Sequence, residues 1–291
     1  MDSNSLSSSP LLLSSNAQGG ITPLNDAVLP NIDRGPMVVR DLNKDGFPDL
    51  MVLNANQNQL IVKMNQQDGT FSAGTSYAVG ISPTFITAGD IDGDQDWDLV
   101  VSNSQVAPQS DLPFYIFVND SGAGNASFLA TPIPVTATGM RQTYGLEVQD
   151  FTGDDKPDIA IADKAGGTIR IFPNTSTLAV SFGPAYSVTL AATFINRMNA
   201  ADFNGDGKPD LVVTDITGTQ VTWLRNTSQG GVPSLGTPVP VTTADSPDGI
   251  DVGDMDGDKD ADIVVACKGA KVTVLLNSGT NAPTFTRLDY A

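Results

Sequence analysis

Most acidic side chains of this 291-residue sequence lie in five segments of nine residues. The segments begin at Asp41, Asp90, Asp150, Asp202 and Asp254, and they align without a gap. Each has Asp at its first, fifth and ninth positions, and Asp, Asn or Thr at its third. In a tight turn the oxygen atoms of alternate positions converge on one point, and the seventh position can add a backbone carbonyl. Such a shell of hard oxygen ligands is what Ca²⁺ prefers.

The closing carboxylate distinguishes these segments from an EF-hand. An EF-hand loop ends with Glu at its twelfth position and lies between two helices. Here the twelfth residue is apolar in every segment: Val52, Val101, Ile161, Val213 and Val265. The closing carboxylate stands at the ninth position and leads directly into a β-branched run. The pattern therefore predicts a calcium loop inside a β-hairpin.

The charge of the segments supports a metal ion independently. They hold 20 of the 33 acidic residues of a chain whose formal charge is −18. Carboxylates ~4–5 Å apart repel each other by a few kcal/mol at an effective dielectric near 20, so empty loops would oppose folding. With ~0.1 mM affinity, ~1 mM calcium would stabilise the fold by roughly 1.4 kcal/mol per site, or about 7 kcal/mol in total. Solvated Asp-Gly turns are the alternative, but five aligned segments favour about five Ca²⁺ ions with a structural role.

The elements around the loops repeat with the same period. Each loop is followed by a short apolar run, predicted to be a strand buried on both faces, at 50–52, 99–101, 159–161, 211–213 and 263–265. An alternating strand comes next and is closed by an Asn, at Asn65, Asn119, Asn174, Asn226 and Asn277. A weaker strand and a short strand then lead into the next loop. No segment has a helical period, and four strands repeated about every 50 residues predict an all-β fold, a β-propeller of four-stranded antiparallel blades.

The blade number is left open by the sequence. Five complete repeats begin near residues 38, 87, 147, 199 and 251, and residues 11–37 resemble the second half of another repeat. The ring could close on five blades with an N-terminal addition, gain an imperfect sixth blade, or belong to a longer propeller; five complete blades are favoured. We expect residues 1–10 to be a disordered Ser-rich tail and residues 11–291 to form one propeller domain.

Composition excludes several kinds of chemistry. The chain has no His and one Cys, so Ser-His-Asp and Cys-His catalysis, His-ligated zinc and intrachain disulfides are excluded. The acidic balance argues against nucleic acid and anionic membranes as partners. No apolar run has the ~20 residues of a membrane span. No signal-peptide pattern opens the chain, so the sequence shown is mature or truncated, or export uses another route.

The segment from Asp202 to Leu211 resembles the consensus of the FG-GAP or VCBS repeats of integrin-α-type β-propellers, a family that includes lectins. The resemblance extends over residues 38–291 and implies that each loop joins the first and second strands of a blade and holds one Ca²⁺. It implies that the side-chain ligands are Asp41, Asn43, Asp45 and Asp49; Asp90, Asp92, Asp94 and Asp98; Asp150, Thr152, Asp154 and Asp158; Asp202, Asn204, Asp206 and Asp210; and Asp254, Asp256, Asp258 and Asp262. The implied carbonyl ligands are those of Phe47, Asp96, Lys156, Lys208 and Asp260.

Four residues depart from the family pattern. Gln95, Asp155 and Lys259 replace the usual Gly at the sixth position, where the turn often needs a positive φ. Thr152 replaces a stronger ligand at the third position of its loop. We therefore expect the third loop to bind calcium most weakly.

Few residues outside the loops carry a chemical signal. Glu147 is the only Glu, and an ordinary strand or surface role is favoured over that of a general acid. Trp97 occupies the eighth loop position, where other repeats have Pro or Ala, and is the best candidate for a ligand contact. Trp223 alternates with polar residues and is expected to pack in the core. Cys267 is expected to be a buried apolar side chain.

Three classes of function fit these features. The favoured one is a non-catalytic, calcium-stabilised propeller that recognises a carbohydrate or a protein surface in extracellular recognition or adhesion. The second is a structural building block that self-assembles in a cell surface, a filament or a virion. The third is a polysaccharide lyase or hydrolase, which needs a catalytic acidic or basic pair that the sequence does not identify. All three place the protein outside the cell, on a cell surface or in a virion.

Overall fold

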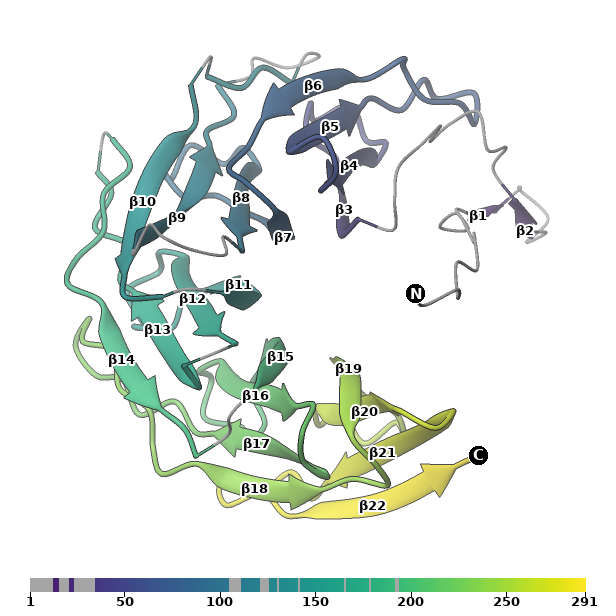
Figure 1. Ribbon diagram of the computed structural model, residues 1–291, viewed down its shortest axis with the longest axis vertical. Coiled ribbons are helices and arrows are strands. Elements are labelled where there is room, and N and C mark those ends of the chain that lie inside the picture. Colours follow the sequence, from purple (N-terminus) through teal and green to yellow (C-terminus); the bar gives the residue numbers. More distant parts are fainter. Residues whose placement is uncertain are drawn as a thin grey trace, which may run out of the picture.

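The computed structural model describes residues 13–15, 21–23, 35–104, 111–120, 126–129, 131–140, 142–164, 166–177, 179–191 and 194–291. Regular secondary structure in these residues consists of β-strands, which form five four-stranded antiparallel sheets and one hairpin (Figure 1). Among them there is no helix that could cross a membrane. The prediction of five complete four-stranded blades is confirmed.

Within each blade the strands are hydrogen-bonded in chain order. The first two blades contain β3 (Met37–Arg40), β4 (Asp49–Asn54), β5 (Gln59–Lys63) and β6 (Thr75–Ala78), then β7 (Pro83–Gly89), β8 (Asp98–Asn103), β9 (Asp111–Phe117) and β10 (Ile133–Thr138). The third and fourth contain β11 (Thr143–Gln149), β12 (Asp158–Asp163), β13 (Thr168–Phe172) and β14 (Tyr186–Thr189), then β15 (Ile195–Ala201), β16 (Asp210–Asp215), β17 (Gln220–Leu224) and β18 (Val239–Thr242). The fifth contains β19 (Pro247–Gly253), β20 (Asp262–Cys267), β21 (Lys271–Asn277) and β22 (Phe285–Tyr290).

The five blades form an arc and do not close into a ring. The first strands β3, β7, β11, β15 and β19 stand side by side around the centre, and a gap separates β19 from β3 (Figure 1). A hairpin of β1 (Leu13–Ser15) and β2 (Ile21–Pro23) is drawn beside this gap, outside the five sheets. Direct closure on five blades, one of the three alternatives left open by the sequence, is thus not observed. The predicted tail at residues 1–10 and most of the half-repeat lie outside the described residues.

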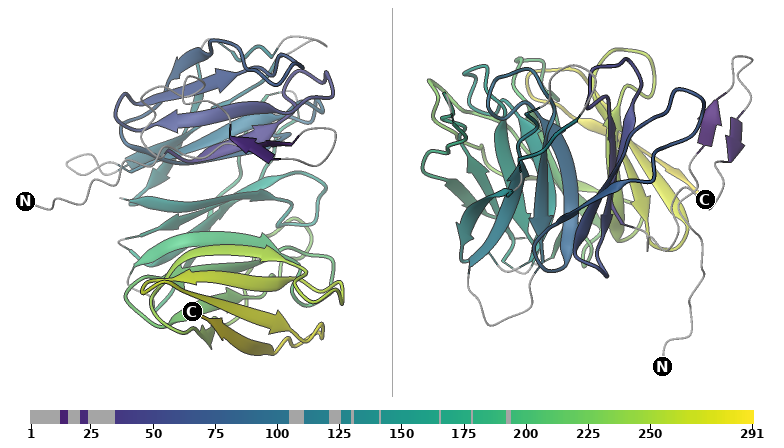
Figure 2. Two further views of the ribbon diagram at one scale, coloured as in Figure 1. Left: turned by 90° about the vertical axis from the view of Figure 1, so that its right-hand side faces the viewer. Right: turned by 90° about the horizontal axis from the view of Figure 1, so that it is seen from above.

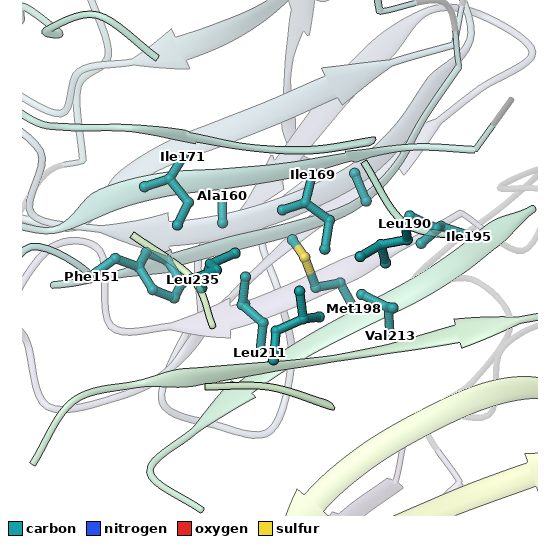
Figure 3. Packing of buried hydrophobic residues seen from close by; sticks show 12 residues of the cluster. Phe151, Ala160, Ile169, Ile171, Leu190, Ile195, Met198, Leu211, Val213 and Leu235 are labelled. Atoms are coloured by element: carbon teal, nitrogen blue, oxygen red, sulfur yellow. The ribbon is translucent and has the colours of Figure 1, made fainter. Parts of the chain in front are cut away.

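The hydrophobic core lies between neighbouring sheets, which stack as layers in the side view (Figure 2). At the joint between the third and fourth blades, Ile169 and Ile171 of β13 face Leu211 and Val213 of β16, with Met198 between them (Figure 3). Every residue of β4, β8, β12 and β16 is buried, as expected for β-branched runs with a sheet on either side. The second strand of each blade is therefore its most buried element.

Each acidic loop joins the first strand of a blade to the second. The first strand ends directly before the loop, and the second strand begins at the ninth loop residue. Because the first strands stand side by side around the arc, the five loops lie along one rim of it. This placement agrees with the one implied by the family resemblance.

Candidate functional site

The first Asp of each loop organises the turn through backbone hydrogen bonds. In the fourth loop, Asp202 Oδ1 accepts from Gly205 N at 2.8 Å, and Asp202 Oδ2 accepts from Gly207 N at 2.7 Å. The fifth-position Asp206 accepts from Lys208 N at 3.1 Å. The second, third and fifth loops repeat this pattern, and in the first loop Asp41 accepts from Asp45 N and Gly46 N. An Asp side chain can accept hydrogen bonds from backbone N–H groups a few residues further on.

The sixth loop position has a positive φ in all five loops. The φ angles are 71° at Gln95, 64° at Asp155 and 78° at Lys259, so the strain expected at these three non-glycine residues is present. The fourth position also has a positive φ throughout, and Lys44 adopts 58° where the other loops have Gly. Alignment of the five loops did not indicate that the fourth position also needs a positive φ.

The ninth Asp is the buried end of every loop. Asp98 Oδ1 accepts from Asn119 N, and Asp98 Oδ2 accepts from Ile91 N, both at 2.8 Å. The corresponding side chain is completely buried in all five blades. Removal from water raises the pKa of Asp98 to about 7 and the pKa values of Asp158 and Asp210 to about 6. A cation beside these carboxyls would favour their charged form.

Carboxylates of the loops converge where the third residue is also Asp. The oxygen atoms of Asp90, Asp92 and Asp98 lie within 4.8 Å of one another, as do those of Asp254, Asp256 and Asp262. The structure thus brings the first, third and ninth positions together. The fifth-position Asp belongs to neither group, and its role as a ligand, like that of the seventh carbonyl, remains a prediction.

The third-position oxygen atoms test whether the loops fit a metal ion. Asp92 Oδ1, Thr152 Oγ1 and Asn204 Oδ1 are buried and have no hydrogen-bond partner. An unsatisfied buried polar atom costs about 1–3 kcal/mol, so it needs a partner. A hard cation between the third and ninth positions would be such a partner for an oxygen atom. The second, third and fourth loops therefore fit Ca²⁺ by this test, and Thr152 still offers an oxygen atom at the position where a stronger ligand was expected. In the first and fifth loops the third-position oxygen atoms of Asn43 and Asp256 accept a backbone N–H.

A hollow of about 530 Å³ lies where the first three blades meet beside the loops. Its lining includes Arg40, Trp97, Glu147 and Gln149, which come from three different blades. Trp97 is 39% exposed, as expected for a contact residue, and the guanidinium carbon of Arg40 lies 5.2 Å from the centre of its ring.

Glu147 is a strand residue, which is one of the two roles that the sequence favoured, and its carboxyl lies in an unusual environment. It lies on the first strand β11, beside the hollow. Burial raises its pKa to about 8, and the charge of Asp251 on β19 raises it further in the same direction. This environment favours the protonated form of the carboxyl, a property that composition could not indicate.

Two packing predictions are confirmed. Trp223 is buried, and its Nε1 donates to Asp210 Oδ2 at 3.3 Å, a contact with the ninth loop position that the sequence did not suggest. Cys267 is buried and free.

The profile of the FG-GAP-like repeat matches residues 41–101, 150–213 and 202–265, which together cover more than half of the chain. The chain belongs to the FG-GAP-like repeat family. No curated protein sequence matches it.

Solved structures share the fold of this FG-GAP-like chain at low sequence identity. A functionally unknown protein from Desulfotomaculum acetoxidans DSM 771 is 16% identical with a TM-score of 0.60; 89% of this chain matches 70% of that one. A putative 6-phosphogluconolactonase from Bacteroides fragilis NCTC 9343 is 16% identical with a TM-score of 0.60, and 93% of this chain matches 73% of it. The exotype rhamnogalacturonan lyase YesX is 13% identical with a TM-score of 0.50, and 93% of this chain matches 50% of it. The chain spans only part of each of these proteins, and the likeness shows the fold alone.

Proposed function

We propose that this FG-GAP-like protein is a calcium-stabilised, non-catalytic recognition module that works outside the cell. Each of the five loops would hold one Ca²⁺. The observation that carries this proposal is the buried third-position oxygen atom without a hydrogen-bond partner in three of the loops, beside a buried ninth-position carboxylate that is present in all five. Loops of this kind in extracellular modules bind calcium with affinities near the millimolar level found outside cells. Calcium is much scarcer inside a cell. Such loops would be empty there, and the carboxylates within each loop would repel one another.

The recognised ligand is proposed to be a carbohydrate bound in the hollow beside the loops. Trp97 supplies an exposed aromatic ring, and Arg40, Glu147 and Gln149 supply polar groups around it. A concave site that combines an aromatic surface with a few polar groups is typical of small-molecule recognition. A protein surface is the alternative ligand.

A glycan array tests this proposal in 1 mM calcium with the wild-type chain. Trp97→Ala should abolish binding. Phe47→Ala removes another exposed aromatic side chain of a loop, outside the hollow, and should leave binding unchanged. Isothermal titration with calcium should give about five sites. Glycan binding that is equal in the two variants would contradict the assignment of the hollow, and a calcium stoichiometry of zero would contradict the metal sites.

Glu147 favours a second candidate function, a polysaccharide-acting enzyme. A carboxyl that is still protonated at neutral pH can act as a general acid, and one structural neighbour is named as a lyase. If this candidate is right, Glu147→Gln loses turnover of a polysaccharide panel but still binds the polysaccharide. Absence of turnover by the wild-type chain, together with glycan binding, would favour recognition.

A further inference from the structure

Three positive side chains lie near the centre of the arc, at the rim opposite the acidic loops. The first strand of each blade ends at its loop, so its first residues stand at this opposite rim, around the centre (Figure 1). Arg197 is the third residue of β15, and Lys164 and Lys268 directly follow the second strands β12 and β20. We call Lys164, Arg197 and Lys268 the axial cations. They belong to the third, fourth and fifth blades and come near one another only in the assembled arc.

Two of the axial cations lie over aromatic rings. The guanidinium carbon of Arg197 is 4.8 Å from the centre of the Phe85 ring, and Lys164 Nζ is 4.1 Å from the centre of the Tyr144 ring. The two rings contact each other edge to face, with their centres 6.2 Å apart. Phe85 belongs to β7, so Arg197 extends past β11 to reach it. A cation held by the face of a ring is positioned without the use of its N–H donors.

The axial cations have no carboxylate partner, although the chain has 33 acidic residues and only 15 basic ones. The ion pairs among the described residues are formed by other cations: Lys44 with Asp96, Arg225 with Asp206, and Arg287 with Asp289. In the same part of the chain, the guanidinium of Arg197 makes one hydrogen bond, from Nη1 to the carbonyl oxygen of Asn196 at 3.3 Å. Most of its five N–H donors therefore stay available for a ligand.

The charges around Lys164 are not balanced. Burial lowers the pKa of Lys164, the positive charges of Arg197 and Lys268 lower it further, and only Asp248 opposes them. Three positive charges thus face one negative charge, an excess of two. The Asp248 carboxylate already accepts a hydrogen bond from Asn196 Nδ2 at 2.6 Å. In a chain with a formal charge of −18, this is a local surplus of positive charge.

A carboxylate is the anion that suits this arrangement. A guanidinium fork binds planar carboxylates and also phosphates through two parallel hydrogen bonds. The local surplus is only two positive charges, and the acidic residues elsewhere in the chain repel anions of high charge. A singly charged group is therefore favoured over a phosphate or a polyanion. The half-buried rings of Phe85 and Tyr144 add partly exposed apolar surface beside the fork.

We propose that the axial cations form a second binding site, which takes the carboxylate of an acidic sugar. Arg197 holds the carboxylate through its N–H groups, and Lys164 and Lys268 add positive charge nearby. The choice of a sugar rests on the proposed function, whereas the choice of a carboxylate rests on the cations alone. The site lies at the opposite rim from the hollow beside Trp97, so the two sites can be tested separately.

Isothermal titration of the full chain with sodium glucuronate, in 1 mM calcium at low salt, tests this site. Arg197→Gln should weaken glucuronate binding by roughly tenfold or more, because it removes charged hydrogen-bond donors. Lys268→Gln changes an exposed side chain and should weaken binding by about threefold, so it gives a readout even if Arg197→Gln does not fold. Arg287→Gln is the matched control: this exposed cation already pairs with Asp289, and its loss should leave the affinity unchanged.

The proposal is overturned if the wild-type chain does not bind glucuronate, or if Lys268→Gln and a folded Arg197→Gln bind it as tightly as the wild type does. Tighter binding of N-acetylglycinate, which carries the carboxylate of a peptide terminus, would overturn the choice of a sugar. Tighter binding of inorganic phosphate would overturn the choice of a carboxylate. Trp97→Ala should leave glucuronate binding unchanged, so a failure of the recognition proposed for the hollow would appear on the glycan array and not in this titration.

Discussion

The two ends of each acidic loop differ in what surrounds them. At the buried end, the ninth Asp accepts backbone N–H groups from its own loop or from the end of the third strand, as Asp98 does from Ile91 and Asn119. At the exposed end, the fifth Asp accepts a local N–H, as Asp94 does from Asp96, and in two loops also an exposed side-chain donor, as Asp206 does from Arg225. The buried carboxyl is thus part of the folded sheet with or without a metal ion. The exposed carboxylates have weaker, solvent-exposed partners, such as Arg225 beside Asp206, and an ion would give them a stronger one.

Removal of calcium should have the largest effect, because it acts on the exposed ends of all five loops at once. Loss of about 7 kcal/mol of binding free energy corresponds to a fall in the melting temperature of about 15 °C or more. Thermal unfolding followed by circular dichroism in 1 mM calcium and in excess chelator measures this difference. Chelator already saturated with calcium is the control, and an unchanged melting temperature in free chelator would show that the loops are ordinary solvated turns.

A pair of substitutions in the fourth loop compares its two ends directly. Asp210→Ala leaves the buried donors of Asn226 and Trp223 without an acceptor, so it should cost about 3 kcal/mol in chelator, and about 1.4 kcal/mol more in calcium because a ligand is lost as well. Asp206→Ala should cost about 1.4 kcal/mol in calcium and much less in chelator. Urea denaturation in both conditions gives the four values. If both variants lose stability only when calcium is present, the difference proposed between the buried and the exposed end of the loop is contradicted.

The pH dependence of stability should reverse when calcium is added. Burial raises the pKa of Asp98 to about 7 in the folded chain, so the metal-free fold binds protons that the unfolded chain releases from about pH 4 upward. The stability of the metal-free protein should therefore fall as the pH rises from 4 to 7. Calcium needs charged carboxylates, so its contribution should grow over the same range.

Melting temperatures at pH 5 and pH 7.5, with calcium and with chelator, measure this effect. Asp98→Asn, which cannot titrate, should flatten the slope in chelator. A metal-free protein that becomes more stable toward pH 7.5 would contradict the role assigned to the buried carboxyls.

The smallest expected effect comes from the third loop. Thr152→Asp adds a carboxylate beside Asp158, so repulsion should lower the stability in chelator by less than about 1 kcal/mol. In calcium the same group is a stronger ligand than a hydroxyl, and the calcium-dependent gain in stability should increase. Calcium titration of both proteins measures the gain. Thr152→Val is the matched control, since it removes the oxygen atom and should weaken calcium binding.

Much of the fold could be predicted because its signals are local. The three residues after Asp49, Asp98, Asp158 and Asp210 are apolar in every repeat, as expected for a strand with a sheet on either side, and they lie in the most buried strands. The positive φ at Gln95 followed from alignment with a glycine of other loops. Sequence patterns of this kind report the surroundings of a residue within its own hairpin.

Features that depend on neighbouring blades could not be predicted in the same way. The sequence places an asparagine at the end of the alternating strand of every repeat, but the hydrogen bonds of these asparagines to the preceding blade join residues such as Asn174 and Ile91, which are 83 positions apart. Arg40, Trp97 and Glu147 belong to three repeats and meet only because the first strands converge at the centre. Nothing within one repeat indicates that burial raises the pKa of Glu147 at this place.

The amino-acid sequence by itself determined the repeat, the strands of each blade and the turn that gathers oxygen atoms, because these follow from alternation, turn residues and charge within about 50 residues. The tertiary structure alone decided that the arc stays open, that Met255 is exposed while Phe203 at the same loop position is buried, and which side chains share the central hollow. Burial and pKa values depend on what packs against a residue from other blades, and that packing exists only once the blades have assembled around a common centre.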